Sequence, residues 1–532
     1  ITSAASLSVS LTSDLGADVT TSGAQTYTGN VTLSGADRTL QGSTITTNGT
    51  IVGGANSLTI TGNAVFGDAT TDTVTGVKIL SVSGNTTIHT NTITTSGTQT
   101  YGDNAASDTI TLGNSTTLTT TNSQITFNGT VNSEGSETNS LTLGVGSSEV
   151  EFNGIVGGGQ TLNAIAITGA LDLNAAITSA ASLSVSLTSD LGANVTTSGT
   201  QTYSGATTLS AATVTLTTTS SNVNFYGTVN SDSTAKALTV SIGSGTLVFG
   251  NDTGDTVGNL VALGAISITG ALDLNAAITS AASLSVSLTS DLGASVTTSG
   301  NQTYSSAVTL SVSPTLTATS GTILFSSTVD GNATGRTLTI TNGGVSNTGD
   351  VTFTGAVGGG SFVLGGITIT TDVLTAAAIK STGTLSITNA GTSSISGIIS
   401  EGTSALAVTK AGAGKLTLTA NNTYAGVTTI SAGTLQLGDG TSLTGSLSTS
   451  GITNNSALIY DSSADQTISY VISGTGTVQV VARQRVLSFS GNSYLLTTAQ
   501  TLLANSTVAE IYGRITGGNM NGLSVSVSTP AG

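Results

Sequence analysis

The chain has 532 residues, of which 10 are Lys or Arg and 26 are Asp or Glu, so its formal net charge is −16 at pH 7. It has no Cys and a single His, which excludes a disulfide framework, a thiol nucleophile and metal sites built from thiolates or His clusters. The scarcity of cations argues against a nucleic-acid partner, and no apolar run of about 18 residues is present, so we predict no membrane span.

The N-terminal segment is one copy of a repeat. Residues 1–17 read ITSAASLSVSLTSDLGA, and the same letters recur at 177–193 and 278–294. The later copies extend to 27 identical residues, 167–193 and 268–294, at an offset of 268 − 167 = 101 residues. Such self-similarity is the signature of a repeat architecture. Since no secretory signal is visible, we expect the chain to begin inside a repeat unit of a larger or cleaved parent.

A second landmark recurs through the first two thirds of the chain. The motif TTSG-x-QTY ends at Tyr27, Tyr101, Tyr203 and Tyr304, at spacings of 74, 102 and 101 residues. Between these landmarks apolar and polar residues alternate, as in LSVSL at 7–11, and Gly, Asn, Asp and Ser clusters separate the alternating segments. Period-two alternation is typical of strands with one buried face, and no segment has helical periodicity.

Two all-β architectures fit repeats near 100 residues, a string of sandwich domains and a β-solenoid. A sandwich cannot shorten from 101 to 74 residues and keep its two sheets, whereas a solenoid can lose whole coils because each coil contacts only its neighbours. We therefore predict a right-handed parallel β-helix with about 20 residues per coil. The whole chain would then form about 27 coils and, at about 4.8 Å per coil, a rod of roughly 130 Å.

One segment carries a family resemblance. Residues 411–438 read AGAGKLTLTANNTYAGVTTISAGTLQLG and resemble the autotransporter-associated β-strand repeat, with Val427 where that family usually has a second Gly. Residues 1–370 resemble more loosely the repeats of filamentous-haemagglutinin-like bacterial surface proteins. The resemblance implies a secreted β-helix that serves as an adhesin stalk, matrix fibre or cell-surface coat.

From these patterns we expect three regions. Residues 1–398 form a repetitive solenoid with long repeats of about 100 residues, and 399–478 continue it with autotransporter-type repeats. Residues 479–532 differ from the Thr/Ser/Gly-rich composition of the preceding residues and contain Arg483, Arg485 and Arg514. We interpret this last region as atypical terminal coils, a cap or a junction, because terminal repeats of solenoids are usually atypical.

Several acidic residues fall in turn-like segments. Calcium requires several converging carboxylates, and each of these loops supplies only two, so we interpret them as solvated turns. The residues are Asp68 and Asp72, Asp252 and Asp255, Glu134 and Glu137, and Glu149 and Glu151.

Other candidates also have ordinary structural explanations. We place His89 on the outward side of its strand, with no acidic neighbour nearby, and Arg483 and Arg485 on a solvated face. AGAGKL at 411–416 lacks the spacing of a phosphate loop. The Thr-rich segments 117–121 and 215–220 would form an ice-binding face only if they stacked in register as a flat array.

We therefore predict no catalytic, cofactor-binding or metal-binding residue, no cofactor and no enzymatic activity. The expected function is that of an extracellular structural protein of the bacterial surface or matrix, with a mechanical role as a surface fibre, adhesin stalk or filament. Expected partners are other copies stacked head to tail, because open coil ends invite strand pairing, or adjoining segments of a parent chain. An alternative is an adhesin module that binds glycans or a host surface without self-assembly.

Overall fold

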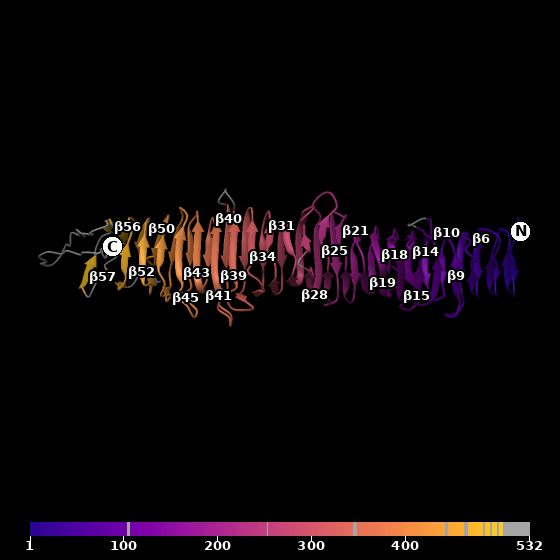
Figure 1. Ribbon diagram of the computed structural model, residues 1–532, viewed down its shortest axis with the longest axis horizontal. Helices are drawn as coiled ribbons and strands as arrows, with labels where there is room; N and C mark the ends of the chain where they lie inside the picture. The colour runs from indigo at the N-terminus through magenta and orange to yellow at the C-terminus, as the bar shows by residue number, and fades with distance from the viewer. Residues whose placement is uncertain are drawn as a thin grey trace. The chain divides into compact units, whose positions relative to one another are not determined.

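The computed structural model describes residues 1–103, 107–252, 254–343, 348–441, 445–461, 466–481, 485–489, 492–496 and 500–503, and for 466–467 and the last three ranges it describes only the backbone. The chain divides into two compact units, Ile1–Ala271 and Leu272–Gly532. All regular structure in the described residues is β-strand. The strands within each unit lie side by side as successive rungs (Figure 1).

Unit 1 consists of three parallel ladders. The first contains β1 (Leu7–Val9), β4 (Gln25–Tyr27), β6 (Arg38–Thr47), β8 (Leu58–Phe66), β11 (Thr86–Ile88), β14 (Thr109–Leu112), β17 (Thr130–Ser133), β20 (Ile177–Val185), β22 (Val195–Thr197), β25 (Thr213–Thr217) and β28 (Ala237–Phe249). The second contains β2 (Ser13–Leu15), β5 (Val31–Leu33), β7 (Ile51–Val52), β9 (Thr73–Val77), β12 (Thr92–Thr95), β15 (Thr116–Thr119), β18 (Leu141–Phe152), β19 (Leu162–Leu173), β20, β23 (Gln201–Tyr203), β26 (Val223–Phe225) and β28. The third contains β3 (Val19–Thr20), β6, β8, β10 (Leu80–Val82), β13 (Gln99–Tyr101), β16 (Ile125–Phe127), β18, β19, β21 (Ser189–Leu191), β24 (Thr207–Leu209), β27 (Val229–Ser231) and β29 (Thr256–Val257).

Unit 2 has the same three-ladder plan. One ladder contains β30 (Leu263–Leu274), β32 (Ser290–Leu292), β35 (Val308–Leu310), β38 (Val329–Gly331), β43 (Ile379–Asn389) and β45 (Ile399–Glu401). Another contains β31 (Ala277–Val286), β33 (Val296–Thr298), β36 (Thr315–Ala318), β39 (Thr337–Asn342), β41 (Leu364–Thr371), β43, β46 (Ala407–Ala411), β49 (Thr428–Ile430), β52 (Gly451–Asn454) and β55 (Val471–Ser473). The third contains β31, β34 (Gln302–Tyr304), β37 (Gly321–Phe325), β40 (Gly349–Phe353), β42 (Leu374–Ala376), β44 (Ser393–Ile395), β47 (Lys415–Leu418), β50 (Thr434–Leu437), β53 (Ala457–Tyr460) and β56 (Thr477–Val480).

The predicted parallel β-solenoid is therefore confirmed, with about 22 turns of about 21 residues each. The described residues form fewer coils than the 27 expected for the whole chain. Some rungs are longer than 20 residues, such as the step from Gln99 to Ile125 (125 − 99 = 26), and parallel pairing in the ladder that contains β53 ends at β56.

The core follows the alternation in the sequence. Within a strand such as β4, the first and third residues are buried and the middle one is not. Parallel pairing in register places like residues above one another at about 4.8 Å, so apolar side chains form continuous inward columns. Where one long strand serves two ladders it must bend, and β19 bends at Gly169, whose φ is 152°. A Cβ atom there would lie 2.1 Å from Val145 Cγ2, so only glycine fits.

Three inward columns begin with the tyrosine of the QTY motif and continue with phenylalanines. Their rings stack with centroids 4.8–5.6 Å apart, and every ring is at most 2% exposed. The columns are Tyr101–Phe127–Phe152 and Tyr203–Phe225–Phe249 in unit 1, and Tyr304–Phe325–Phe353 in unit 2. In these three copies the next rung places a Phe in register with the tyrosine of the QTY motif, whereas Tyr27 lies in register with Thr47.

Antiparallel pairing begins at the end of the parallel ladders of unit 2. β59 (Gln500–Leu503) pairs antiparallel with β56. β57 (Arg485–Phe489) pairs parallel with β54 (Gln466–Ile468) and antiparallel with β58 (Asn492–Leu496). The region boundaries at 398/399 and 478/479 stay predictions.

Candidate functional site

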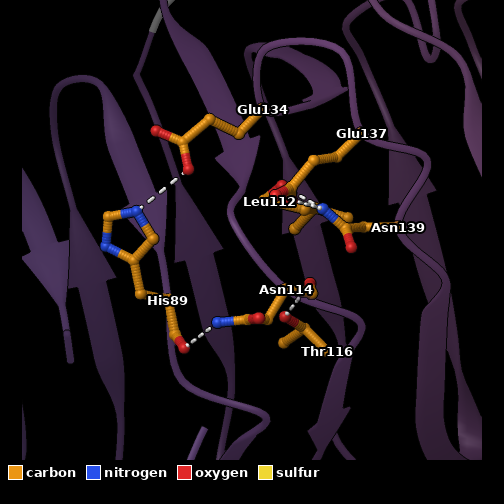
Figure 2. A network of polar contacts seen from close by, with 7 residues as sticks. All are labelled: His89, Leu112, Asn114, Thr116, Glu134, Glu137 and Asn139. Atoms are coloured by element: carbon orange, nitrogen blue, oxygen red, sulfur yellow. Dashed lines mark hydrogen bonds and ion pairs between the residues drawn. The ribbon is translucent and has the colours of Figure 1, made fainter. Parts of the chain in front are cut away.

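The single histidine lies in a polar network on the outside of unit 1 (Figure 2). His89 follows β11, and its Nε2 lies 3.1 Å from Glu134 Oε2, with the two side chains 30% and 48% exposed. Asn114 Nδ2 donates to the His89 carbonyl over 2.5 Å. The expectation that His89 has no acidic neighbour was wrong, because two turns of the solenoid bring together residues that are 45 apart in sequence.

A glycine makes the His89–Glu134 contact possible. The imidazole reaches across the intervening rung at Gly113, where a Cβ atom would lie 2.1 Å from His89 Cδ2. Nearby, Asn139 Nδ2 donates to the Leu112 carbonyl and to Glu137 Oε2. The network therefore ties successive coils together, and within it the imidazole contacts a carboxylate rather than the hydroxyl group that a nucleophile pair would require.

The recurring aspartates close their own loops. Asp72 Oδ2 accepts hydrogen bonds from the amides of Asp68 and Ala69 at 3.2 and 3.0 Å. Asp255 Oδ2 accepts from the amides of Asn251 and Asp252, both at 3.1 Å. Each carboxylate thus accepts from the amides three and four residues before it and holds its own loop closed.

Of the remaining pair, Glu149 lies in register with Ala170, whereas Glu151 belongs to an outward column of carboxylates that sequence reasoning missed. Glu151, Asp172 and Asp190 occupy the same position on three successive rungs of the third ladder. Burial, opposed by a hydrogen bond from Asn174 and reinforced by the charges of Asp190 and Glu151, raises the pKa of Asp172. In unit 2, Asp273 lies beside Asp291, and burial together with that charge raises the pKa of Asp273.

Polar neighbours satisfy the carboxylates of this column in unit 1. Gln124 Nε2 donates to Glu149 Oε1 and Glu151 Oε2 at 3.0 and 3.3 Å, and the Ser210 hydroxyl donates to Asp190. No group of three or more His, Cys, Asp or Glu side chains in the part of the chain that the structure describes is arranged to hold a metal ion.

The threonine-rich segments do not form one array. Segment 117–121 begins in β15 of the second ladder, whereas 215–220 begins in β25 of the first ladder. The stacked face required for ice binding by these two segments is therefore absent from unit 1. Within the second ladder, Thr73, Thr92, Thr117 and Thr142 do stack on successive rungs.

The QTY motif builds a buried clasp at the coil corner. In the third copy, Gln201 Nε2 donates to Val195 O, to Thr197 Oγ1 and, across to the next coil, to Thr217 O at 2.9 Å. The Tyr203 hydroxyl donates to Gln201 Oε1 over 3.2 Å. The same contacts recur at Gln25, Gln99 and Gln302.

Burial makes these tyrosines hard to ionise. It raises the pKa of Tyr27 to about 12 and raises the pKa values of Tyr101, Tyr203 and Tyr304 further. The motif was visible in the sequence, but its role in linking coils was not, because the carbonyl that it reaches across to, such as Thr217 O, lies on the neighbouring coil.

The three clasps of unit 1 face in different directions around the solenoid. Tyr27 belongs to the first ladder, Tyr101 to the third and Tyr203 to the second. The spacings of 74 and 102 residues therefore do not correspond to a whole number of turns. Features repeated with this motif are distributed over all three faces rather than aligned on one.

Two buried cations were also missed. Lys410 is fully buried in an inward column between Ile387 and Ile430, and burial lowers its pKa to about 8. Its Nζ donates to the carbonyls of Ala411, Gly412 and Ala432 at 2.8, 2.9 and 3.2 Å. In unit 1 the guanidinium of Arg38 donates in the same way to carbonyls, including Leu15 O at 2.6 Å. Both cations cap corner carbonyls, a role that alternation alone does not predict for a charged residue.

The glycine-rich segment 411–416 is a packed corner. The Gly414 amide donates to Asn389 O over 3.0 Å, so that amide is not free to bind an anion. Lys415 Nζ donates to Gln436 Oε1 over 3.3 Å. Of the other candidates, Arg483 and Arg514 lie outside the described residues, and of Arg485 only the backbone in β57 is described.

No helix among the described residues is long and apolar enough to cross a membrane. Residues 408–437 match the family model of the passenger-associated-transport-repeat, which confirms the resemblance to autotransporter repeats. The matched segment runs from β46 to β50 and contains Lys410. Comparison with curated proteins and with solved structures gave no match. The looser resemblance of 1–370 to filamentous-haemagglutinin-like repeats stays a prediction.

Proposed function

We propose that this chain is a non-enzymatic structural β-solenoid of a bacterial surface or matrix protein, of the kind carried as an autotransporter passenger. The observation that carries the proposal is the passenger-associated-transport-repeat at 408–437, which lies within the continuous ladders of a solenoid. This repeat implies a secreted or surface location. A fibre, stalk or filament is the mechanical role that such a solenoid serves.

The use of polar groups supports a structural role. The carboxylates of Asp72 and Asp255 close turns, and the buried amides of the Gln clasps bond coil to coil. A hydrolase of polysaccharides needs an acid and a base converging on one cleft. The polar side chains described above instead form hydrogen bonds with one another and with the backbone, within and between coils.

Self-assembly by head-to-tail stacking belongs to the same proposal. A coil end that is not covered presents open strand edges, and such edges pair readily with further strands. The rival proposal, an adhesin module that binds glycans, needs a site repeated along one face. The distribution of repeated features over three faces in unit 1 favours the structural role.

Sedimentation velocity of the full chain over a range of concentrations tests this proposal, with a glycan array probed in parallel. We expect the sedimentation coefficient to rise with concentration and no glycan class to be enriched. A constant sedimentation coefficient together with selective glycan binding would establish the rival function instead.

A further inference from the structure

One outward surface of unit 2 is built from hydroxyl-bearing side chains. It lies on the ladder that contains β33, β36, β39, β41 and β43. The inward residues of four of these strands form a fully buried apolar column, which consists of Leu316, Ile340, Ile369 and Ile387. Because side chains alternate along a strand, the residues on either side of this column point outward.

These outward residues form two columns, which we call the hydroxyl face. The first column has a Thr or Ser on eight successive rungs, namely Thr315, Thr339, Thr368, Ser386, Thr409, Thr429, Thr453 and Ser473. The second column lies two residues further along the strands and has a Thr on five successive rungs, namely Thr297, Thr317, Thr341, Thr370 and Thr388. Four rungs, β36, β39, β41 and β43, therefore carry a hydroxyl group in both columns.

The hydroxyl face has no charged or aromatic side chain in either column. The outward residues of the other two ladders of unit 2 differ. Asp273, Asp291 and Asp330 follow the ladder of β30, β32 and β38, and Asp350 and Lys415 lie in β40 and β47 of the remaining ladder. The uncharged surface is therefore a property of one ladder and not of the whole unit.

The hydroxyl groups of this face are also available to a ligand. Among the described residues, none forms a hydrogen bond with the side-chain hydroxyls of the four rungs β36, β39, β41 and β43. On a neighbouring ladder of unit 2, by contrast, the Ser311 hydroxyl donates to the carboxylate of Asp291. The free hydroxyl groups must therefore be satisfied from outside the protein.

Parallel pairing in register gives the hydroxyl face two fixed spacings. Successive rungs are about 4.8 Å apart, and residues i and i+2 of one strand are about 6.6 Å apart. The surfaces of an ice crystal present oxygen atoms at repeat distances of similar size. Threonine is restricted at χ1 because it is β-branched, so its methyl and hydroxyl groups are already ordered and lose little conformational freedom against an ordered lattice.

We propose that the hydroxyl face on β36, β39, β41 and β43 binds ice. The hydroxyl groups take the place of water molecules at the crystal surface, and the methyl groups lie between them. Sites for small molecules combine aromatic walls with a few placed polar groups, whereas this face repeats one uncharged side chain in two dimensions, which fits a crystalline lattice. This activity goes beyond the proposed structural role and does not depend on it.

The test measures adsorption of the fluorescently labelled full chain to ice. When polycrystalline ice grows slowly from a dilute solution, the chain should be enriched in the ice relative to a labelled soluble protein of similar mass. The lowest concentration that inhibits recrystallisation of small ice crystals gives a second, quantitative readout of the same binding.

Two lysine variants provide a matched comparison. Thr368 and Thr375 are both exposed and each lies between two buried residues of its strand, but Thr368 belongs to the hydroxyl face and Thr375 to the ladder beside it. Thr368→Lys should raise the concentration needed for inhibition by at least about tenfold, and Thr375→Lys by less than about twofold. Equal melting curves by circular dichroism establish that both variants keep the solenoid.

Three results would overturn the inference. The first is exclusion of the unaltered chain from ice to the same extent as the control protein, a result that does not depend on how the variants fold. The second is equal inhibition by the two lysine variants. The third is retention of the chain on microcrystalline cellulose without adsorption to ice, which would assign the hydroxyl face to a crystalline polysaccharide.

Discussion

At the scale of single residues, this protein uses buried polar side chains to close its coil corners. The Gln clasps, Lys410 and Arg38 all donate hydrogen bonds to backbone carbonyls at these corners. Some of these carbonyls also accept a backbone amide, as Leu15 O does from the Ser34 amide, so the side chain adds a second hydrogen bond there. The side chains also reach the adjacent coil, which links the rungs independently of the ladders.

Lys410 gives a prediction for the dependence of stability on pH. Its pKa is about 8 in the folded protein against a usual 10.5, so between these values the unfolded chain binds more protons than the folded one. Stability should therefore rise as pH increases from 8 toward 10, and it should be lowest below pH 8. Above about pH 10, ionisation of the tyrosines in the unfolded chain reverses the trend.

The measurement is hydrogen exchange of the segment 407–437 at pH 8 and pH 10, corrected for the intrinsic rates. In Lys410→Met the rise in stability should disappear, whereas Lys78→Met, which alters an exposed lysine, should retain it. If the stability of Lys410→Met kept the full dependence on pH, another group would be its cause and the prediction would be wrong.

Sequence reasoning predicted some of these single-residue features. Alternation placed His89 correctly on the outside of its strand, since it follows the buried Ile88. Alternation could not identify Glu134 as its neighbour, because the number of residues per turn varies from rung to rung. Alternation does place Lys410 on the inward side together with Val408, and its aliphatic stem is long enough to lie in the core with the amine at the corner.

At the scale of elements, some stacked columns of side chains stabilise the fold and others place like charges next to one another. The Tyr–Phe–Phe columns gain apolar burial and ring stacking, whereas the column Glu151–Asp172–Asp190 places like charges on adjacent rungs. Both arise from parallel in-register pairing, which makes every rung repeat the chemistry of the rung before it.

The aromatic columns should contribute strongly to the stability of unit 1. Phe225 is fully buried between the rings of Tyr203 and Phe249. Phe225→Ala should lower the free energy of unfolding of its coils by about 3–5 kcal/mol. Phe362 is 43% exposed, so Phe362→Ala should change stability by less than about 1 kcal/mol. Chemical denaturation of the two variants tests this contrast, and equal losses would contradict it.

In the carboxylate column, by contrast, we predict that a conservative substitution raises the stability of the protein. Because the pKa of Asp172 is raised in the folded protein, its charged form opposes folding at neutral pH, and stability should increase as pH falls through that raised pKa. Asp172→Asn should therefore raise the melting temperature at pH 7 and reduce this pH dependence.

Asp14→Asn is the matched control for this column, because Asp14 has the local sequence of Asp190 but pairs with Thr32 and has no acidic neighbour in its ladder. Its melting temperature at pH 7 should stay close to that of the unaltered chain. If Asp172→Asn melts at the same temperature as Asp14→Asn or below it, the claim that the carboxylate column destabilises the folded protein is contradicted.

The strands themselves were predictable from alternation, and the columns were not. Glu151, Asp172 and Asp190 are separated by 21 and 18 residues (172 − 151 and 190 − 172), so no fixed period in the sequence brings them together. The same irregularity places segments 117–121 and 215–220 in different ladders, although their letters suggested a single array.

At the scale of the whole molecule, the length of the long sequence repeat is not a whole multiple of the length of one solenoid turn. The motif that ends at Tyr27, Tyr101 and Tyr203 moves from one ladder to another within unit 1. A solenoid built this way distributes its repeated features around its axis, which suits a fibre or coat more than a one-sided binding surface. The proposed assembly would use the coil ends, because uncovered strand edges pair with further strands.

Electron microscopy of the purified full chain over a series of concentrations tests this account most directly. We predict end-to-end assemblies that lengthen as concentration rises. Separate particles of one size at every concentration would contradict the proposal that the chain functions by stacking.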